Sequence, residues 1–218
     1  KNSQNSPPEP ISTRGEIPDF LETIIKWLPT SVKITPMNIT LFGGSFNPPH
    51  LGHKIIISQA FELIENLDEL WLLPDYQHAF AKGKFFAPAK TRLKLVKKLM
   101  KATDSPTTPV RVETCCFDQK MPGNTIFHIT YLRKKYPHHQ FSFLMGSDNL
   151  TTFDRWPKYK ILLKLMKFYI YPRSGHPLKP LYKNMTPLEH PLQVITNISS
   201  TMVRNRLEQK LPTKLLTV

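Results

Sequence analysis

The sequence predicts an α/β protein with a Rossmann-like fold, in which a parallel sheet carries helices on both faces. Short apolar segments alternate along the chain with longer segments of helical pattern, as in a chain of βαβ units. The apolar segments are hydrophobic nearly throughout, which is typical of strands that are buried on both faces. A length of 218 residues suits one such domain, and no internal repeat or second domain is needed.

Eleven segments make up this alternation, each assigned from its apolar pattern and its flanking polar residues. The expected strands cover residues 37–43, 69–74, 109–114, 140–146, 167–172 and 192–196. The expected helices cover residues 54–67, 87–102, 125–136, 158–166 and 199–209. Only the fifth and sixth strands follow one another without a helix between them.

The chain before residue 37 has a different character. Residues 1–16 are rich in Asn, Ser and Pro and offer little to bury, so we expect a flexible extension. Residues 17–28 carry apolar side chains at helical spacing between two prolines, which predicts one amphipathic helix. We therefore divide the chain into an N-terminal extension, residues 1–36, and an α/β domain, residues 37–218.

Composition limits the possible partners and the location. The formal net charge is +14, which attracts polyanions such as nucleic acids or phosphate-rich ligands. No run approaches the roughly 18 to 20 apolar residues of a membrane-spanning helix, so no membrane partner is expected. Cys115 and Cys116 are adjacent, and we read them as two reduced thiols on a strand. Their reduced state predicts a cytoplasmic location.

Two loops at expected carboxyl ends of strands carry the polar groups of interest. In doubly wound sheets, ligands bind beyond those ends, where the strand order reverses. The loop "GGSFNPPHLGH" follows the first strand, and "GSDNLTTFDRW" follows the fourth. In the first loop, Gly43 and Gly44 allow close approach of a ligand to the backbone. His50 and His53 then lie on one face of a helix start, where they can donate to phosphate oxygens.

Two alternative roles for these histidines are open. Each could be a structural cap or a packed core residue. Zinc binding is another alternative, but two histidines without a nearby carboxylate or thiol form an incomplete ligand set. A second polar segment, "ISSTMVR", favours phosphate binding. Ser199, Ser200 and Thr201 open the last helix, and Arg204 follows on the same face.

The two segments together resemble known motifs. "GGSFNPPHLGH" resembles the HxGH motif of the nucleotidyltransferase superfamily, and "ISSTMVR" resembles its ISSTxxR motif. Within that superfamily, "GSDNLTTFDRW" and the basic loop "HAFAKGKFFAPAKTR" are similar to segments of the nicotinate-nucleotide adenylyltransferases. Pantetheine-phosphate adenylyltransferases share both nucleotide motifs, and they are the nearest enzymatic alternative. A basic RNA-binding protein without catalysis is a second alternative.

The resemblance implies transfer of AMP from ATP to nicotinate mononucleotide, and possibly to nicotinamide mononucleotide, with release of pyrophosphate. It implies three catalytic residues around the reacting phosphates: His50, His53 and Arg204. The nucleotide-binding residues that it implies are Gly43, Gly44, Ser45, Phe46, Asp148, Ser199, Ser200 and Thr201. The substrate-binding residues that it implies are Lys82, Arg92, Asn124, Thr125 and Trp156. Mg²⁺ is expected to arrive with ATP, held by phosphates and water, so no dedicated metal site is expected.

The sequence departs from the family pattern beside the expected pyridine site. Trp156 matches the family's tryptophan that stacks on the ring, but Pro157 has no N–H to offer a nicotinate carboxylate. Residues 123–125, "GNT", stand where a Tyr-Thr pair is usual. We expect a preference for nicotinate mononucleotide, with weaker selectivity against the amide than in the family.

Overall fold

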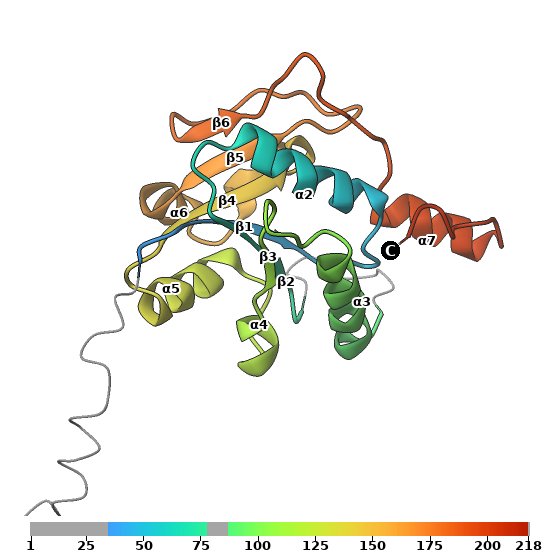
Figure 1. Cartoon of the computed structure of the whole chain (residues 1–218), viewed down its shortest axis with the longest axis horizontal. Helices are drawn as coiled ribbons and strands as arrows, with labels where there is room; N and C mark the ends of the chain where they lie inside the picture. Colours follow the sequence, from blue (N-terminus) through green and yellow to red (C-terminus); the bar gives the residue numbers. More distant parts are fainter. Residues whose placement is uncertain (1–34, 78–86, 218) are drawn as a thin grey trace, which may run out of the picture. The chain divides into compact units, whose positions relative to one another are not determined.

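The computed structural model describes residues 35–77 and 87–217. Within those residues, six strands form one sheet in the order β3-β2-β1-β4-β5-β6, and all neighbouring strands are parallel (Figure 1). The strands are β1 (Asn38–Gly44), β2 (Glu69–Pro74), β3 (Val110–Val112), β4 (Gln140–Gly146), β5 (Lys167–Tyr171) and β6 (Met185–Pro187). The helices are α2 (Leu51–Leu63), α3 (Ala89–Lys101), α4 (Cys115–Asp118), α5 (Thr125–Lys135), the 3-10 helix η1 (Ser147–Arg155), α6 (Tyr159–Leu165) and α7 (Ser200–Glu208). The predicted fold class is confirmed.

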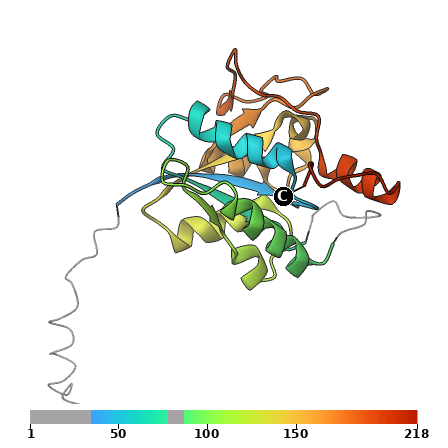
Figure 2. The ribbon, with the colours of Figure 1, turned by 45° about the vertical axis from the view of Figure 1, so that its right-hand side comes forward.

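The sheet has a hydrophobic core on each face. Because successive strand residues point to opposite faces, Leu41 of β1 packs into one core and Phe42 into the other. The core around Phe42 includes Ile57 of α2 and Val96 of α3, so these two helices cover one face. In Figures 1 and 2, the sheet separates α2 from α5.

The opposite core is the larger of the two and contains most of the aromatic side chains. Leu41 packs there with apolar residues of α4, α5, η1 and α6. Trp71 and Phe143 are buried in this core, at the centres of β2 and β4. Burial of both faces explains why the strands read as continuous apolar segments in the sequence.

The strand order reverses beside β1. The chain runs outward from β1 through β2 to β3, and then returns to add β4 on the other side of β1. Phe42 of β1 pairs with Leu144 of β4, so the carboxyl ends of these two strands lie next to each other. The two loops singled out in the sequence therefore open onto one edge of the sheet, as predicted.

The sixth predicted strand was wrong. Residues 192–196 form no strand, and the sixth strand is β6, which begins seven residues earlier, at Met185. Leu192 is 83% exposed, so the apolar alternation of residues 192–196 does not reflect burial in a sheet. The backbone of Val194 bonds to side chains instead, because its N–H donates to Gln59 Oε1 and its carbonyl accepts from the Tyr171 hydroxyl.

The cysteines were also placed wrongly. Cys115 and Cys116 are free and buried, as expected, but they open the short helix α4 and do not continue β3. The buried carboxylate of Glu113 explains the change of direction. Its Oε1 accepts from the Cys115 N–H at 2.9 Å, and this bond helps turn the chain directly after the strand.

The predicted N-terminal extension lies outside the described residues, apart from its last two positions. Its flexibility, its amphipathic helix and its boundary at residue 36 stay predictions. In the ranges 35–77 and 87–217, no helix is both long enough and apolar enough to cross a membrane.

Candidate active site

His50 and His53 are held together at the start of α2. His50 is the N-cap residue, and its backbone N–H donates to Nδ1 of His53 at 3.1 Å. The two rings lie 3.8 Å apart between centroids. Since Nδ1 of His53 accepts a hydrogen bond, the neutral ring carries its proton on Nε2. His53 therefore keeps one N–H donor for a ligand.

Both histidines are neutral at physiological pH. Burial and, to a smaller extent, the positive charge of Arg173 lower the pKa of His50 to about 3. Burial also lowers the pKa of His53, with smaller contributions from His50 and Arg173. Nδ1 of His50 is buried and has no hydrogen-bond partner in the described part of the chain. A buried polar atom without a partner is unfavourable, and this nitrogen faces Gly52 at the start of α2.

Gly52 allows the His50 ring to take this position. A Cβ atom at residue 52 would lie 3.0 Å from the His50 ring and 3.2 Å from the Ile198 carbonyl oxygen. The glycine therefore lets α2 approach both the histidine and the chain that leads into α7. The space beside Gly52 is therefore filled by protein.

The "ISSTMVR" segment is bonded to the first loop, from which it is about 150 residues distant in sequence. Ser199 caps α7, because its Oγ accepts from the Met202 N–H at 3.1 Å. Ser200 Oγ donates to the Pro48 carbonyl at 2.8 Å. Arg204 donates to the Asn47 carbonyl at 2.7 Å and to Thr201 Oγ1 at 3.0 Å. The two sequence motifs thus form one structural unit.

Arg173, which the sequence analysis missed, lies between these elements. It follows β5, and its Nη2 donates to the Ile198 carbonyl at 3.1 Å. Its Nε lies 4.0 Å from Oδ1 of Asp148. Its position directly after the expected strand 167–172, at the same edge as the two motifs, was the available signal.

Most of the predicted residues line a single cavity, which we call the histidine pocket. It is also lined by Arg173, and it opens at the carboxyl edge of the sheet between α2, β4 and α7. The predicted residues in its wall are Gly43, Gly44, Ser45, Phe46, His50, His53, Asp148, Trp156, Ser199, Ser200, Thr201 and Arg204. Two arginines and several N–H and hydroxyl donors make this pocket suitable for phosphate groups.

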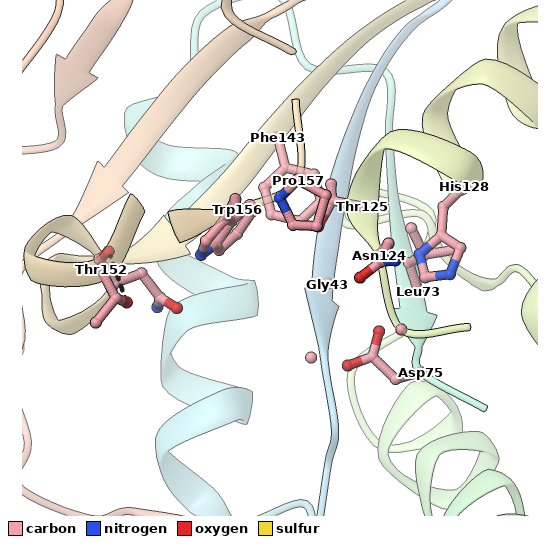
Figure 3. Close-up of a pocket in the computed structure, with 13 residues that line it drawn as sticks. Gly43, Leu73, Asp75, Asn124, Thr125, His128, Phe143, Thr152, Trp156 and Pro157 are labelled. Atoms are coloured by element: carbon pink, nitrogen blue, oxygen red, sulfur yellow. Dashed lines mark hydrogen bonds between the residues drawn. The ribbon is translucent and has the colours of Figure 1, made fainter. Parts of the chain in front are cut away.

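A second cavity, the tryptophan pocket, shares Gly43, Gly44 and Trp156 with the first. It also contains the predicted residues Asn124 and Thr125 at the start of α5. Figure 3 shows Trp156 on one side of β1 and Asn124 on the other. Trp156 packs edge-to-face against Phe143, with ring centroids 6.0 Å apart. The shared wall means that ligands in the two pockets would meet over the end of β1.

Gly43 at this shared wall cannot accept a side chain without strain. A Cβ atom there would lie 2.5 Å from Cζ of Phe143, which is buried and cannot move easily. We expect Gly43→Ala to lower the free energy of unfolding by about 1–3 kcal/mol through overpacking. Denaturant unfolding measures this loss. Gly44→Ala is the matched control, because its Cβ would lie 3.7 Å from the nearest atom of Phe46. Equal losses in the two variants would contradict the explanation.

Two predicted substrate-binding residues are not part of either described wall. Lys82 lies outside the described residues. Arg92 is buried on α3, and its guanidinium donates to backbone carbonyls of Ser45, Asp75, Tyr76 and Ala87. These bonds hold the loops after β1 and β2. We therefore replace the predicted phosphate contact of Arg92 with a role in positioning those loops.

The polar groups of the histidine pocket suit a metal ion that enters together with a phosphate ligand. Asp148 is the one carboxylate among the described residues of the histidine pocket. No group of three or more His, Cys, Asp or Glu side chains within residues 35–77 and 87–217 could hold an ion. A single carboxylate beside several phosphate-binding groups suits Mg²⁺, which keeps most of its water and phosphate ligands.

Comparison with known proteins identifies the family. The model of cytidylyltransferase-like proteins matches residues 41–206. Probable nicotinate-nucleotide adenylyltransferases of Flavobacterium johnsoniae and Nitratiruptor sp. are 31% and 33% identical over 174 and 170 residues. These matches cover 79% and 77% of this chain and 88% of each relative.

A solved structure has the same fold. The nicotinic acid mononucleotide adenylyltransferase of Plasmodium falciparum, complexed with NaAD, matches with a TM-score of 0.68 at 17% identity. The match covers 81% of this chain and 86% of that one. Taken with the two linked motifs and the sequence relatives, the chain belongs to the cytidylyltransferase-like family and, within it, to the nicotinate-nucleotide adenylyltransferases.

Proposed function

We propose that the protein transfers AMP from ATP to nicotinate mononucleotide, and also to nicotinamide mononucleotide, in the biosynthesis of NAD. The observation that carries this proposal is the wall shared by the histidine and tryptophan pockets. ATP in the first pocket and a mononucleotide in the second would bring the acceptor phosphate next to the α-phosphorus of ATP. Both relatives named above are called probable nicotinate-nucleotide adenylyltransferases.

The chemistry needs positioning and charge stabilisation more than a strong base. The mononucleotide phosphate is already ionised, so an oxygen of it can attack the α-phosphorus while the bond to pyrophosphate breaks. We assign the Nε2–H of His53 and the ring of His50 to the phosphate oxygens around the α-phosphorus. Arg204, with the Ser199–Thr201 turn, would stabilise the departing pyrophosphate. Asp148 is assigned to an adenosine ribose hydroxyl.

Mg²⁺ belongs to this proposal as a partner of ATP. When bound, it would neutralise charge on the phosphates. Asp148, the carboxylate of the described histidine pocket, is assigned to the ribose, so phosphates and water would hold the ion. The proposed reaction depends neither on a reducing, cytoplasmic location nor on a particular oligomeric state.

The test of this function is an assay of ATP with three acceptors in parallel. Nicotinate mononucleotide, nicotinamide mononucleotide and phosphopantetheine are each supplied with Mg²⁺, and both pyrophosphate release and the adenylylated product are measured. We expect the corresponding dinucleotide with the pyridine mononucleotides, and a preference for nicotinate. Product from phosphopantetheine alone would assign the protein to the alternative enzyme. Salt-sensitive binding to RNA with no transfer would favour the RNA-binding alternative.

Trp156 should contribute to binding of the pyridine ring. A flat indole face attracts a pyridinium cation by about 0.5–2 kcal/mol. We therefore expect Trp156→Ala to raise the KM for nicotinate mononucleotide far more than the KM for ATP. Steady-state kinetics with each substrate varied in turn will measure both values, and Trp156→Phe should retain part of the difference. Equal increases for both substrates would remove Trp156 from the ring site.

A further inference from the structure

Asp75 places a carboxyl group in the tryptophan pocket. The residue follows directly after β2, and Figure 3 shows its carboxyl group directed toward Gly43, below Asn124. Its backbone is fixed on both sides. The Asp75 N–H donates to the Gly44 carbonyl at 3.0 Å, and the Asp75 carbonyl accepts from Nη1 of Arg92 at 2.6 Å. The carboxyl group is therefore held at a set position in the wall.

The described wall of this pocket contains no Lys or Arg side chain, and the Arg92 charge that acts on Asp75 lies outside that wall. His128 is its other ionisable residue, and Nε2 of His128 is bonded to the Pro122 carbonyl at 3.0 Å. Burial lowers the pKa of His128 to about 4, so the ring is neutral at physiological pH. The histidine pocket differs sharply, because Arg173 and Arg204 line it.

This arrangement affects the two pyridine mononucleotides differently. Both carry a cationic ring, which an ionised Asp75 attracts. Nicotinamide mononucleotide adds a carboxamide, whose N–H groups can donate to a carboxylate. Nicotinate mononucleotide adds a negative group, which an ionised Asp75 repels. The start of α5 at Thr125 acts in the opposite direction, because a helix N-terminus favours an anion.

We propose that Asp75 determines the acid-to-amide selectivity of this pocket, by weakening the preference for nicotinate mononucleotide so that the protein also uses nicotinamide mononucleotide. This inference rests on the proposed function. In this proposal, the start of α5 favours binding of the acid and Asp75 favours binding of the amide. The measured preference for nicotinate mononucleotide is the balance of these two effects.

The balance should depend on pH. Burial raises the pKa of Asp75 to about 7, and the positive charge of Arg92 opposes that increase. From α4, Cys116 faces Asp75 as a neutral thiol, since its own pKa is raised, and from α5 the neutral His128 lines the same pocket. Asp75 therefore gains its charge between about pH 6 and pH 8. The preference for nicotinate should decrease across that range.

The experiment compares kcat/KM for the two mononucleotides in the wild type, Asp75→Asn and Asp154→Asn, at pH 6 and pH 8. The ratio of the two values cancels the titration of the phosphate that both substrates share. Asp75→Asn should raise the acid-to-amide ratio about tenfold at pH 8, as expected when one partly screened repulsion is removed. The increase should be smaller at pH 6. Asp154 is an exposed carboxylate of η1 that lines neither pocket, and its variant should keep the wild-type ratio.

Each outcome decides the inference. An unchanged ratio in an active Asp75→Asn variant, or an equal change in Asp154→Asn, would overturn it. If Asp75→Asn does not fold, Asp75→Ser and the wild-type pH profile take its place. A wild-type ratio that does not decrease from pH 6 to pH 8 would also contradict the inference. If the wild type forms no dinucleotide from nicotinate mononucleotide and none from nicotinamide mononucleotide, the proposed function itself is wrong.

Discussion

His53→Ala should lower kcat for dinucleotide formation by about 10²–10³-fold, which is typical for the loss of one donor that faces developing charge. The structure explains the choice of His53. Its Nδ1 accepts the His50 N–H, which leaves its Nε2–H as the donor for a ligand, and the His50 ring lies 3.8 Å away. The measurement is pyrophosphate release at saturating ATP and nicotinate mononucleotide.

A second variant separates the roles of the two ring nitrogens of His53. In His53→Asn, a side-chain oxygen can still accept from the His50 N–H, while the donor to the substrate is lost or displaced. We expect both variants to melt near the wild-type temperature and both to be slow. His138→Ala, at an exposed residue outside both pockets, is the control. A folded His53→Ala variant with the wild-type rate would remove His53 from the mechanism.

The absence of a charge on His53 also has a testable consequence. Because burial lowers the pKa of His53, the ring stays neutral as the pH falls from 8 to 6. A decrease in kcat over that range must therefore come from other groups, such as the phosphate of the mononucleotide. This is the opposite of the behaviour expected for an exposed histidine with a pKa near 6.5.

Much of the fold could be predicted because buried parallel strands leave a strong local pattern. The apolar segments at β1, β2 and β4 were placed within one residue of their observed limits. Residues 192–196 show the limit of this reasoning. They have the alternation of a strand, but Gln59 and Tyr171 bind the backbone of Val194, and these side chains lie far away in the sequence. Local pattern cannot show which partner a backbone group will find.

The residues of the candidate site could likewise be predicted only in part. His50, His53 and Arg204 could be predicted because short motifs fix their positions at the ends of strands and the starts of helices. Arg92 could not be distinguished from a phosphate-binding arginine, because its burial against four backbone carbonyls appears only in the folded chain. Asp75 was missed for a related reason. A single Asp after a strand is an ordinary turn residue until its neighbours are known.

Arg173 is the residue outside the two motifs whose removal should have the largest effect on catalysis. It lines the histidine pocket, lies close enough to lower the pKa of both His50 and His53, and holds the Ile198 carbonyl. A guanidinium in this position can stabilise negative charge that moves from the α-phosphate to the departing pyrophosphate. We expect Arg173→Ala to lower kcat/KM for ATP about 10²-fold.

The matched control for Arg173 is Arg206→Ala. Arg206 lies on α7, donates to the Pro212 carbonyl and lines neither pocket, so its loss should leave kcat/KM for ATP close to the wild-type value. Arg173→Lys should recover part of the rate, since it restores the charge without the two-pronged geometry of the guanidinium. Thermal melts of all three variants separate loss of chemistry from loss of fold. If Arg173→Ala keeps the wild-type kcat/KM, the pyrophosphate must be stabilised by Arg204 and the α7 turn without Arg173, and the role of Arg173 is then to hold the chain at Ile198.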